Sequence, residues 1–434
     1  MSKGSQWKND DKQKSNQDEM MDYTNQDSNF GGHVVYDGVF DIEETASAAI
    51  DSPEMLRGPT TSSSAAVANP PNATVTLEDF ELLKVLGKGA FAKVFCVRKK
   101  TGFDTGTIYA LKVIKKEIVV KKAKYIEHTL SERKILETVK SPFICEMFYA
   151  FQTGGKLYMV LECMAGELFS RMKDCAVMNG QEARFYIVEV LIGLEYLHQH
   201  NIIHRDIKGE NVMLDSTGHV KLADFNLGKM LDGTGKTSSF AGTLDFMAPE
   251  VCLKANYGKA ADWWSVGALL YDMVVGCPPF TNISNRKLKM KKIVRDTVVP
   301  PANLPIEVSS LIIGLMTRNK ETRLGAGGAD EVKAHRFFNR VNWEDAYARR
   351  LSPPFRMNNT DVEAFVYFDR KFTAETPVDL PCDDIPHDLD TPFRGFSYVA
   401  PSVPSLTGEG SSSTGSNNTD SINVNQPSSS TCQN

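Results

Sequence analysis

Residues 204–211 gather several chemically active side chains in a short span that reads His-Arg-Asp-Ile-Lys-Gly-Glu-Asn. Apolar, strand-like runs flank this span, and charges beside buried segments are costly unless they face a polyanionic ligand or a metal ion. Phosphoryl transfer requires a carboxylate that accepts the substrate's hydroxyl proton, a lysine on the moving phosphate, and an Asn and an Asp that bind Mg²⁺. The candidates for these four roles, in the same order, are Asp206, Lys208, Asn211 and Asp224.

A solvated turn rich in polar residues is the simple alternative for this span. That alternative does not explain why five polar residue types all fall at the offsets that the chemistry requires. The pattern resembles the catalytic loop and the magnesium motif of protein kinases. The resemblance implies an α+β, two-lobe protein kinase fold, with a β-rich small lobe, a mainly helical large lobe, and ATP and Mg²⁺ bound between them.

Composition narrows the classes of function that the chain can have. Its 434 residues are 41% hydrophobic, enough for a substantial core, and its net charge of −5 provides no basic footprint for nucleic acid. The eight cysteines are scattered, which indicates free thiols in a reducing compartment. No signal-peptide pattern or membrane-spanning apolar run is present. We therefore expect a soluble protein of the cytoplasm, with the nucleus as a second location, that binds neither nucleic acid nor membrane.

The first 76 residues are rich in Asp, Asn, Gln, Ser and Thr, and we expect a disordered arm there. One island, Val39–Glu44, sets Phe40 and Ile42 among acidic residues, which suits a short motif that docks in a partner's groove. Chance occurrence is the alternative for so short a motif. Residues 40–44 resemble the TOR-signalling motif of ribosomal protein S6 kinases, which implies a TOR complex as a partner through Phe40–Glu44.

Three strand patterns follow, at 80–86, 93–98 and 108–114, with a GxGxxA segment between the first two. A dinucleotide-binding turn has similar glycines, but it must open a helix, whereas a strand follows here. A hairpin that covers the phosphates of ATP is therefore the better interpretation. The resemblance to kinases implies that ATP contacts Leu86, Gly87, Lys88, Gly89, Ala90, Phe91, Ala92, Lys93 and Val94.

Lys112 occupies an inward-facing position of the third strand, where a buried ammonium group needs a partner. A helix predicted from Ile126 to Val139 supplies one, because Glu132 shares its apolar face. We expect a Lys112–Glu132 ion pair that lets the lysine hold the α- and β-phosphates of ATP. Two unrelated surface charges are the alternative, which the core-facing positions of both residues disfavour.

Residues 157–164 form a continuous apolar strand that runs into a connector between two lobes. The resemblance to kinases implies that backbone groups of Glu162 and Met164 bind adenine, with Leu161 as gatekeeper. Glu167 matches the acidic residue that contacts the ribose or a basic substrate, although the connector after Met164 is one residue shorter than usual.

The segment from Asp224 to Glu250 is similar to the activation segment of AGC-group kinases. Ser239 falls where an upstream kinase adds the activating phosphate in that group, and Gly242 and Thr243 match residues that contact the catalytic lysine and aspartate. A solvated serine-rich loop is the alternative. The cationic pocket that would receive the phosphate is matched by His128, Arg205 and Lys229.

We assign the kinase domain to residues 77–338. Within it we expect helices at 181–200 and 262–280, the second of them buried, and an ion pair between Arg323 and Glu250.

Residues 339–402 occur in the order of an AGC-kinase C-terminal tail, which we expect to be extended and docked through its aromatic residues on the small lobe. Its last segment is especially similar to the ribosomal protein S6 kinases of the p70 type, and phosphate on Ser397 would strengthen the docking. Residues 403–434 are expected to be disordered. Together with the 40–44 island, the tail favours an S6 kinase over a protein kinase B-like enzyme.

Glu210 and Asp272 match acidic residues that bind arginines upstream of the target hydroxyl, which implies basic protein substrates with Arg-x-x-Ser/Thr character. Three positions depart from the family pattern: Asn226 replaces the glycine of the magnesium motif, Gly209 a proline of the catalytic loop, and Leu380 a serine of the tail. We expect Asn226 to tolerate a left-handed backbone. A pseudokinase, or a nucleotide-sensing scaffold, is the competing class of function.

Overall fold

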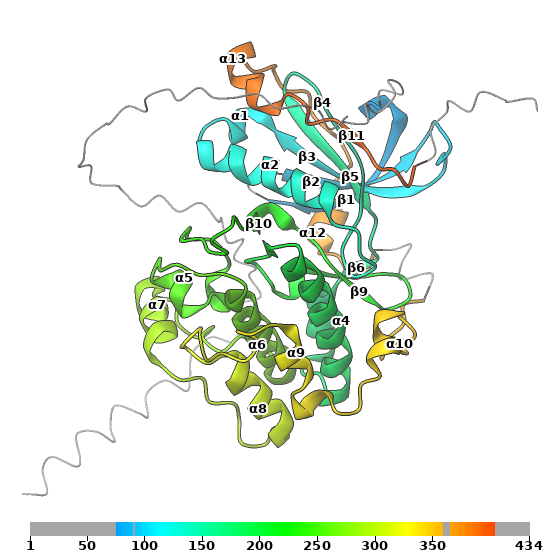
Figure 1. Ribbon diagram of the computed structural model, residues 1–434. Helices are drawn as coiled ribbons and strands as arrows, with labels where there is room; N and C mark the ends of the chain where they lie inside the picture. Colours follow the sequence, from blue (N-terminus) through cyan, green and yellow to red (C-terminus); the bar gives the residue numbers. More distant parts are fainter. Residues whose placement is uncertain (1–74, 90–91, 359–364, 404–434) are drawn as a thin grey trace, which may run out of the picture. The chain divides into compact units, whose positions relative to one another are not determined.

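The computed structural model describes residues 75–89, 92–358 and 365–403. Its first part is an antiparallel sheet with the strand order β1-β2-β3-β5-β4-β11 (Figure 1). These strands are β1 Phe80–Lys88, β2 Ala92–Lys99, β3 Ile108–Lys115, β5 Lys156–Glu162, β4 Met147–Gln152 and β11 Tyr398–Val399. The strands predicted on both sides of the glycine-rich segment are confirmed, and β1 and β2 form the expected hairpin.

The two faces of the sheet carry different apolar clusters because side chains of a strand alternate between faces. Tyr149 and Phe151 of β4 join a cluster with Phe80, whose ring stacks on Phe151 at 6.1 Å between centroids. Ala150 between them faces the opposite cluster, which also contains Leu136 of the helix α2 (Ala123–Thr138). The sheet therefore holds α2, and with it Glu132, on the side that faces the rest of the core. The short helix α1 (Lys116–Val119) precedes α2.

The second part is mainly helical, which confirms the predicted α+β architecture of two lobes (Figure 1). Its helices are α3 Leu168–Cys175, α4 Gly180–Gln199, α5 Pro249–Cys252, α6 Ala260–Val275, α7 Arg286–Arg295, α8 Ile306–Leu315, α9 Ala329–Lys333 and α10 Trp343–Tyr347. Its short strands are β6 Gly166–Glu167, β7 Ile202–Ile203, β8 Val212–Leu214, β9 Val220–Leu222 and β10 Lys229–Met230. Short 3-10 turns occur at Leu77–Asp79, Gly209–Asn211, Phe225–Leu227, Leu244–Phe246, Arg336–Phe338 and Thr391–Phe393.

Helix α6 lies at the centre of the helical lobe, with Trp263 and Trp264 almost completely buried. The sequence predicted that this helix would continue to residue 280, but it ends at Val275. Gly276 adopts a φ of 90° and caps the helix, which a residue with a side chain would resist. The predicted helix 181–200 is confirmed as α4, whose first turn is capped by the side chain of Asn179.

The tail departs from the extended conformation that the sequence predicted. It contains the short helices α12 (Arg370–Thr373) and α13 (His387–Asp390) before strand β11 adds to the edge of the sheet. Phe393 and Phe396 are buried, so the tail aromatics pack on the small lobe. Among the described residues, no helix combines the length and the apolar character needed to span a bilayer.

Candidate active site

The catalytic loop lies between β7 and β8, and Asp206 is almost fully buried there. Asp206 Oδ1 accepts hydrogen bonds from the backbone N–H of Thr243 at 2.8 Å and from Thr243 Oγ1 at 2.7 Å. Lys208 Nζ lies 2.9 Å from the same Oγ1 and 3.1 Å from Asp206 Oδ2. The structure thus brings together the predicted base, the predicted lysine and the threonine of the activation segment.

Asp262, a fully buried residue of α6, holds this loop in place. Its two carboxylate oxygens accept from the backbone N–H groups of His204 at 3.0 Å and Arg205 at 2.8 Å, and its Oδ2 lies 2.9 Å from Nε2 of His198. Arg205 has a φ of 69°, an unfavourable value for a residue with a side chain. Because Asp262 binds both amides, it fixes the turn that directs Asp206 to the site. From the sequence, Asp262 was expected only as the first residue of a buried helix.

Asn211 and Asp224 present oxygen atoms suited to a divalent ion. Asn211 Nδ2 donates to the backbone oxygen of Asp206 at 2.8 Å and to its Oδ2 at 2.9 Å, which directs the amide oxygen away from both. Asp224 Oδ1 accepts from Lys112 at 3.0 Å, and its side chain remains about half exposed. Carboxylate and amide oxygens are ligands that Mg²⁺ prefers, so the residues present fit this ion.

Asp224, and not Asn226, adopts the left-handed backbone in the magnesium motif, with a φ of 56°. The expectation that Asn226 would need to tolerate this conformation is therefore wrong. Asn226 lies within a 3-10 turn, Phe225–Leu227, where an asparagine is not strained. With asparagine at this position, the Asp224 carboxylate lies 3.0 Å from Lys112 Nζ.

The predicted Lys112–Glu132 ion pair is confirmed, with 2.6 Å between Lys112 Nζ and Glu132 Oε1. Burial alone would lower the pKa of Lys112, but Asp224 and Glu132 outweigh it and hold this pKa above its usual value. At Asp224, whose half-exposed carboxyl is only partly desolvated, this desolvation would raise the pKa, but Lys112 keeps it below its usual value. Both groups are therefore charged at neutral pH, as nucleotide and metal binding require.

The glycine-rich hairpin leaves space where its glycines lie. Among the atoms of the described residues, a Cβ atom added to Gly87 would meet none within 4 Å, and one added to Gly89 would meet only Ala92 O at 3.9 Å. Neither glycine has a positive φ. Neither packing against described residues nor backbone strain therefore requires glycine at these positions. Glycine is expected there if a ligand approaches the backbone closely. Ala90 and Phe91 lie outside the described residues.

An apolar cluster lines the region next to this hairpin and the connector. It contains buried or partly buried side chains from five strands and the tail: Leu86, Val94, Ala110, Leu161, Met213 and Phe368. Met164 in the connector is also buried. The Glu162 carboxylate is bound by Lys221 at 2.7 and 2.8 Å, and the Glu162 N–H donates to the backbone oxygen of Glu146 at 2.9 Å, so neither of these groups is available to a ligand. This arrangement has the apolar lining that a purine base requires.

Three carboxylates gather beside the catalytic loop: Glu167, Glu210 and Asp272. Burial, and then the negative charge of Glu210, raise the pKa of Glu167 to about 7. Burial, followed by Glu210 and Asp245, likewise raises the pKa of Asp272 to about 7. Carboxylates that repel one another in this way are stabilised by a cationic ligand.

The serine predicted to be phosphorylated lies against basic side chains. Arg205 Nη1 lies 2.5 Å from Ser239 Oγ, and Lys124 Nζ donates to the backbone oxygen of Phe240 at 3.2 Å. Burial, together with Arg205 and then Lys124, lowers the pKa of His128 to about 4. The third residue of the predicted pocket, Lys229, has its ammonium group 3.5 Å from Glu127 Oε1, so Glu127 partly neutralises its charge. Lys124 was missed, although it precedes His128 by one helical turn.

Arg323 binds Glu250 through two hydrogen bonds of 2.6 and 2.9 Å between buried groups, which confirms the predicted pair. In the tail, Ser397 is exposed, and Arg133 of α2 donates to the backbone oxygens of Phe396 at 3.0 Å and of Ser397 at 3.3 Å. The island at residues 40–44 lies outside the described residues.

Comparison with known proteins agrees with this geometry. Residues 80–338 match the family model described as the protein kinase domain, and residues 358–398 match the protein kinase C terminal domain. Over 80% of the chain the sequence is 49% identical to ribosomal protein S6 kinase beta of Caenorhabditis elegans, of which it covers 64%. It is 41% identical over 76% of the chain to serine/threonine-protein kinase gad8 of Schizosaccharomyces pombe, covering 58% of that protein. It is 43% identical over 75% of the chain to human ribosomal protein S6 kinase alpha-6, covering 43% of that protein.

Proposed function

The chain belongs to the protein kinase family, in the AGC group that carries the additional C-terminal domain, and on this premise we propose that it transfers the γ-phosphoryl group of ATP to serine or threonine residues of proteins. The observation that carries the proposal is the convergence of Lys112, Asp206 and Asp224, which are far apart in the sequence, beside one apolar cluster. The chain spans less than two thirds of the length of the relatives named above, so their substrates and partners enter only as proposals.

The oxygen of the substrate hydroxyl bonds to the γ-phosphorus while the bond from that phosphorus to the leaving ADP oxygen breaks. Asp206 accepts the proton that the hydroxyl loses. Thr243 and Lys208 hold the Asp206 carboxylate in position through the contacts given above. Lys112, kept charged by Glu132, holds the α- and β-phosphates. Mg²⁺ bound by Asn211 and Asp224 would neutralise the charge of the phosphate oxygens.

We assign Glu167, Glu210 and Asp272 to the recognition of arginines upstream of the target residue. The pKa values of Glu167 and Asp272 are raised by burial and then by the charge of Glu210, so a guanidinium group bound near them would relieve repulsion among the carboxylates. The substrates are therefore basic proteins with Arg-x-x-Ser/Thr character.

The similarity to S6 kinases supports three further assignments. The chain acts in TOR-dependent growth signalling in the cytoplasm, with residues 40–44 as the contact to a TOR complex. An upstream kinase phosphorylates Ser239, and phosphate on Ser397 strengthens the docking of the tail. A pull-down that compares the wild type with Phe40→Ala tests the first assignment; undiminished recovery of the TOR complex from the variant contradicts it.

The decisive experiment for the activity is transfer of labelled phosphate from γ-labelled ATP to an arginine-containing serine peptide. Loss of the base in Asp206→Asn is expected to reduce transfer by about 10³-fold, since general base catalysis contributes roughly 10²- to 10⁴-fold. A thermal shift with Mg-ATP controls for folding, because Asp206→Asn leaves the nucleotide contacts in place. Equal transfer by both proteins would instead identify a scaffold without kinase activity.

A further inference from the structure

Helix α7 (Arg286–Arg295) is basic along its whole length. It carries lysine or arginine at positions 286, 287, 289, 291, 292 and 295 and contains no acidic residue. Opposite charges at i and i+4 normally stabilise an exposed helix, whereas like charges at this spacing destabilise it by roughly 0.2–0.5 kcal/mol per pair. The concentration of positive charge in α7 therefore lowers the intrinsic stability of this helix.

Two of the basic residues of α7 serve the fold itself. Lys289 is buried and lies 2.6 Å from Asp245 Oδ1, and the Arg286 guanidinium lies 5.8 Å from the centre of the Phe240 ring. Four others are exposed and form no ion pair with any part of the chain that the structure describes. These four residues, which we call the α7 basic face, are Lys287, Lys291, Lys292 and Arg295.

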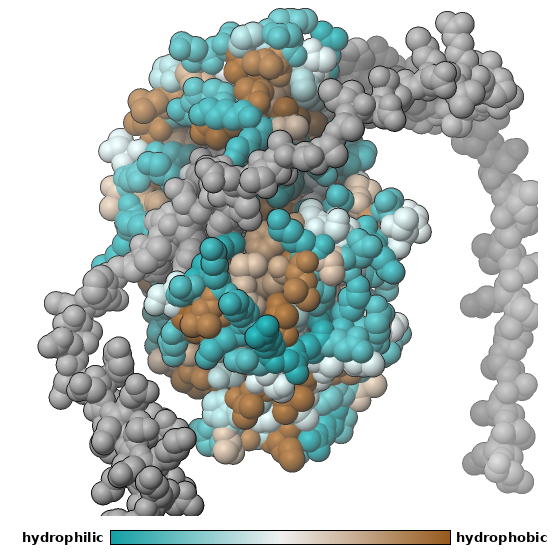
Figure 2. All heavy atoms as spheres, turned by 90° about the vertical axis from the view of Figure 1, so that its left-hand side faces the viewer, coloured by the Kyte–Doolittle hydropathy of each residue, from teal (hydrophilic) through white to brown (hydrophobic). Residues whose placement is uncertain are grey.

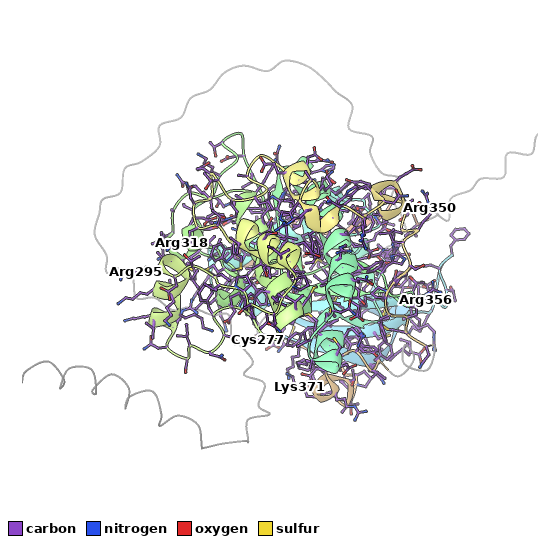
Figure 3. All side chains as sticks on the ribbon, turned by 90° about the horizontal axis from the view of Figure 1, so that it is seen from below. Cys277, Arg295, Arg318, Arg350, Arg356 and Lys371 are labelled. Atoms are coloured by element: carbon purple, nitrogen blue, oxygen red, sulfur yellow. The ribbon has the colours of Figure 1, made fainter. Side chains whose placement is uncertain are left out.

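The surroundings of the α7 basic face add positive charge and one apolar group. Arg318 donates from its guanidinium to the backbone oxygen of Arg295 and so brings a further cation to the end of the helix. Figure 3 shows Arg295 and Arg318 together at one edge of the large lobe, opposite Arg350 and Arg356. Leu288, within the same face, is 47% exposed. Hydrophilic surface predominates around this side of the large lobe, interrupted by apolar patches (Figure 2).

Helix α7 borders the region that a protein substrate must approach. Lys289 binds Asp245, and Asp245 follows two residues after Thr243, whose hydroxyl contacts the base Asp206. Arg286 packs near Phe240 in the same activation segment. When a substrate protein places its serine at Asp206, the part of the substrate's surface next to that serine therefore lies beside α7.

We propose that the α7 basic face binds an acidic segment of the protein substrate, outside the residues that enter the catalytic cleft. This inference rests on the proposed function and refines its substrate class: the target residue follows arginines, and an acidic segment lies elsewhere in the same substrate. Two surfaces of opposite charge in one lobe select such a substrate over a uniformly basic one, which the α7 basic face would repel. Leu288 gives the acidic segment an apolar contact.

The test measures phosphorylation of three peptides by the full chain. The first is an arginine-containing serine peptide, and the other two carry an Asp/Glu-rich extension on a Gly/Ser linker at the N- or C-terminal end. For the wild type, an extension at one end is expected to lower KM about tenfold without a change in kcat, because charge complementarity accelerates encounter by about 10-fold or more. The combined variant Lys291→Glu, Lys292→Glu, Arg295→Glu is expected to lose this gain and to treat the unextended peptide as the wild type does.

The matched control reverses three exposed cations distant from α7: Lys100→Glu, Lys121→Glu and Arg356→Glu. It changes the net charge equally and is expected to retain the gain. The inference is overturned if neither extension lowers KM for the wild type, or if the α7 variant keeps the gain. It is also overturned if the α7 variant loses only binding to phosphatidylserine vesicles, since the face would then serve a membrane.

Failure of the proposed function is recognised separately. A fluorescent acidic peptide bound to the full chain, followed by anisotropy, reports on the α7 basic face without catalysis. Weaker binding to the α7 variant than to the control variant supports the face even if no peptide is phosphorylated. Equal binding to both variants contradicts it even if the enzyme is active.

Discussion

The activation segment and the C-terminal tail both lie against basic side chains, but the two regions neutralise them differently. Around Ser239, Arg205 and Lys124 form no ion pair with any other described residue, and their positive charge helps to keep the pKa of half-buried His128 at about 4. This cluster is stabilised only when an anion arrives. Phosphate on Ser239 would supply about two negative charges at the centre of the cluster.

In the tail, carboxylates of the tail itself neutralise buried lysines of the small lobe. Lys116 is almost completely buried and lies 2.6 Å from Asp390 Oδ1, and Lys156, also buried, lies 2.6 Å from Asp379 Oδ1. Each ammonium group also donates to a backbone oxygen at 2.6 Å, which completes its environment. The comparison indicates that the activation segment depends on added phosphate, whereas the tail docks without modification of Ser397.

The largest expected effect is on kcat/KM, and it distinguishes Ser239 from Ser397. Ser239→Ala removes the phosphate acceptor, and loss of about two charge-assisted hydrogen bonds should lower kcat/KM by about 100-fold in protein treated with an upstream kinase. Ser397→Ala should reduce kcat/KM by less than about 5-fold, because the tail remains docked through its carboxylates. Steady-state kinetics on the arginine peptide measure both values. A larger loss in Ser397→Ala than in Ser239→Ala would reverse the comparison.

The next effect concerns stability. Asp379→Asn removes the charge that neutralises buried Lys156 and should lower the free energy of unfolding by about 2–3 kcal/mol, at the low end for a broken buried pair because one backbone acceptor remains. Urea denaturation measures this loss. The control is the double variant with Lys156→Met, which removes the orphaned ammonium and should recover part of the stability. An unchanged midpoint in Asp379→Asn would show that the tail carboxylate is dispensable.

A smaller loss is expected at the second pair. Asp390→Asn should lower the free energy of unfolding by about 1 kcal/mol, since the Asp390 side chain is 36% exposed and solvent screens its charge. Hydrogen exchange should show residues 391–400 protected in unphosphorylated wild type and less protected in Asp390→Asn. Rapid exchange of this segment in the unphosphorylated wild type would contradict docking without phosphate.

The smallest effect is a pH dependence at His128. Its pKa in the folded protein, about 4, lies below the usual value near 6.5, so the unfolded chain binds the additional proton first. This histidine therefore removes stability as pH falls from about 6.5 towards 4. Phosphate on Ser239 should raise the pKa of His128, which NMR titration of its ring measures, and should diminish that loss. Phosphate on Ser397 should leave this pKa unchanged.

Sequence reasoning was most effective where a function depends on fixed offsets along the chain. The roles proposed for Asp206, Lys208 and Asn211 follow from local spacing, and the pairing of Lys112 with Glu132 follows from two periodicities that each direct one charge inward. The strands of the small lobe and helix α4 were predicted for the same reason, since alternation and helical period are properties of the local sequence. The end of α6 was missed because a single glycine, Gly276, overrides an apolar run.

The amino-acid sequence by itself determined the family, the chemistry of the catalytic loop and the order of the two lobes, because these depend on short motifs and local periodicity. Only the tertiary structure decided that carboxylates of the tail neutralise two buried lysines, since Lys116 and Asp390 are separated by 274 positions and Lys156 and Asp379 by 223. It also decided that Asp224 and not Asn226 takes the left-handed backbone, and that Asp262 binds two amides of the catalytic turn. Burial gives these contacts their strength, and burial is a property of the packed chain.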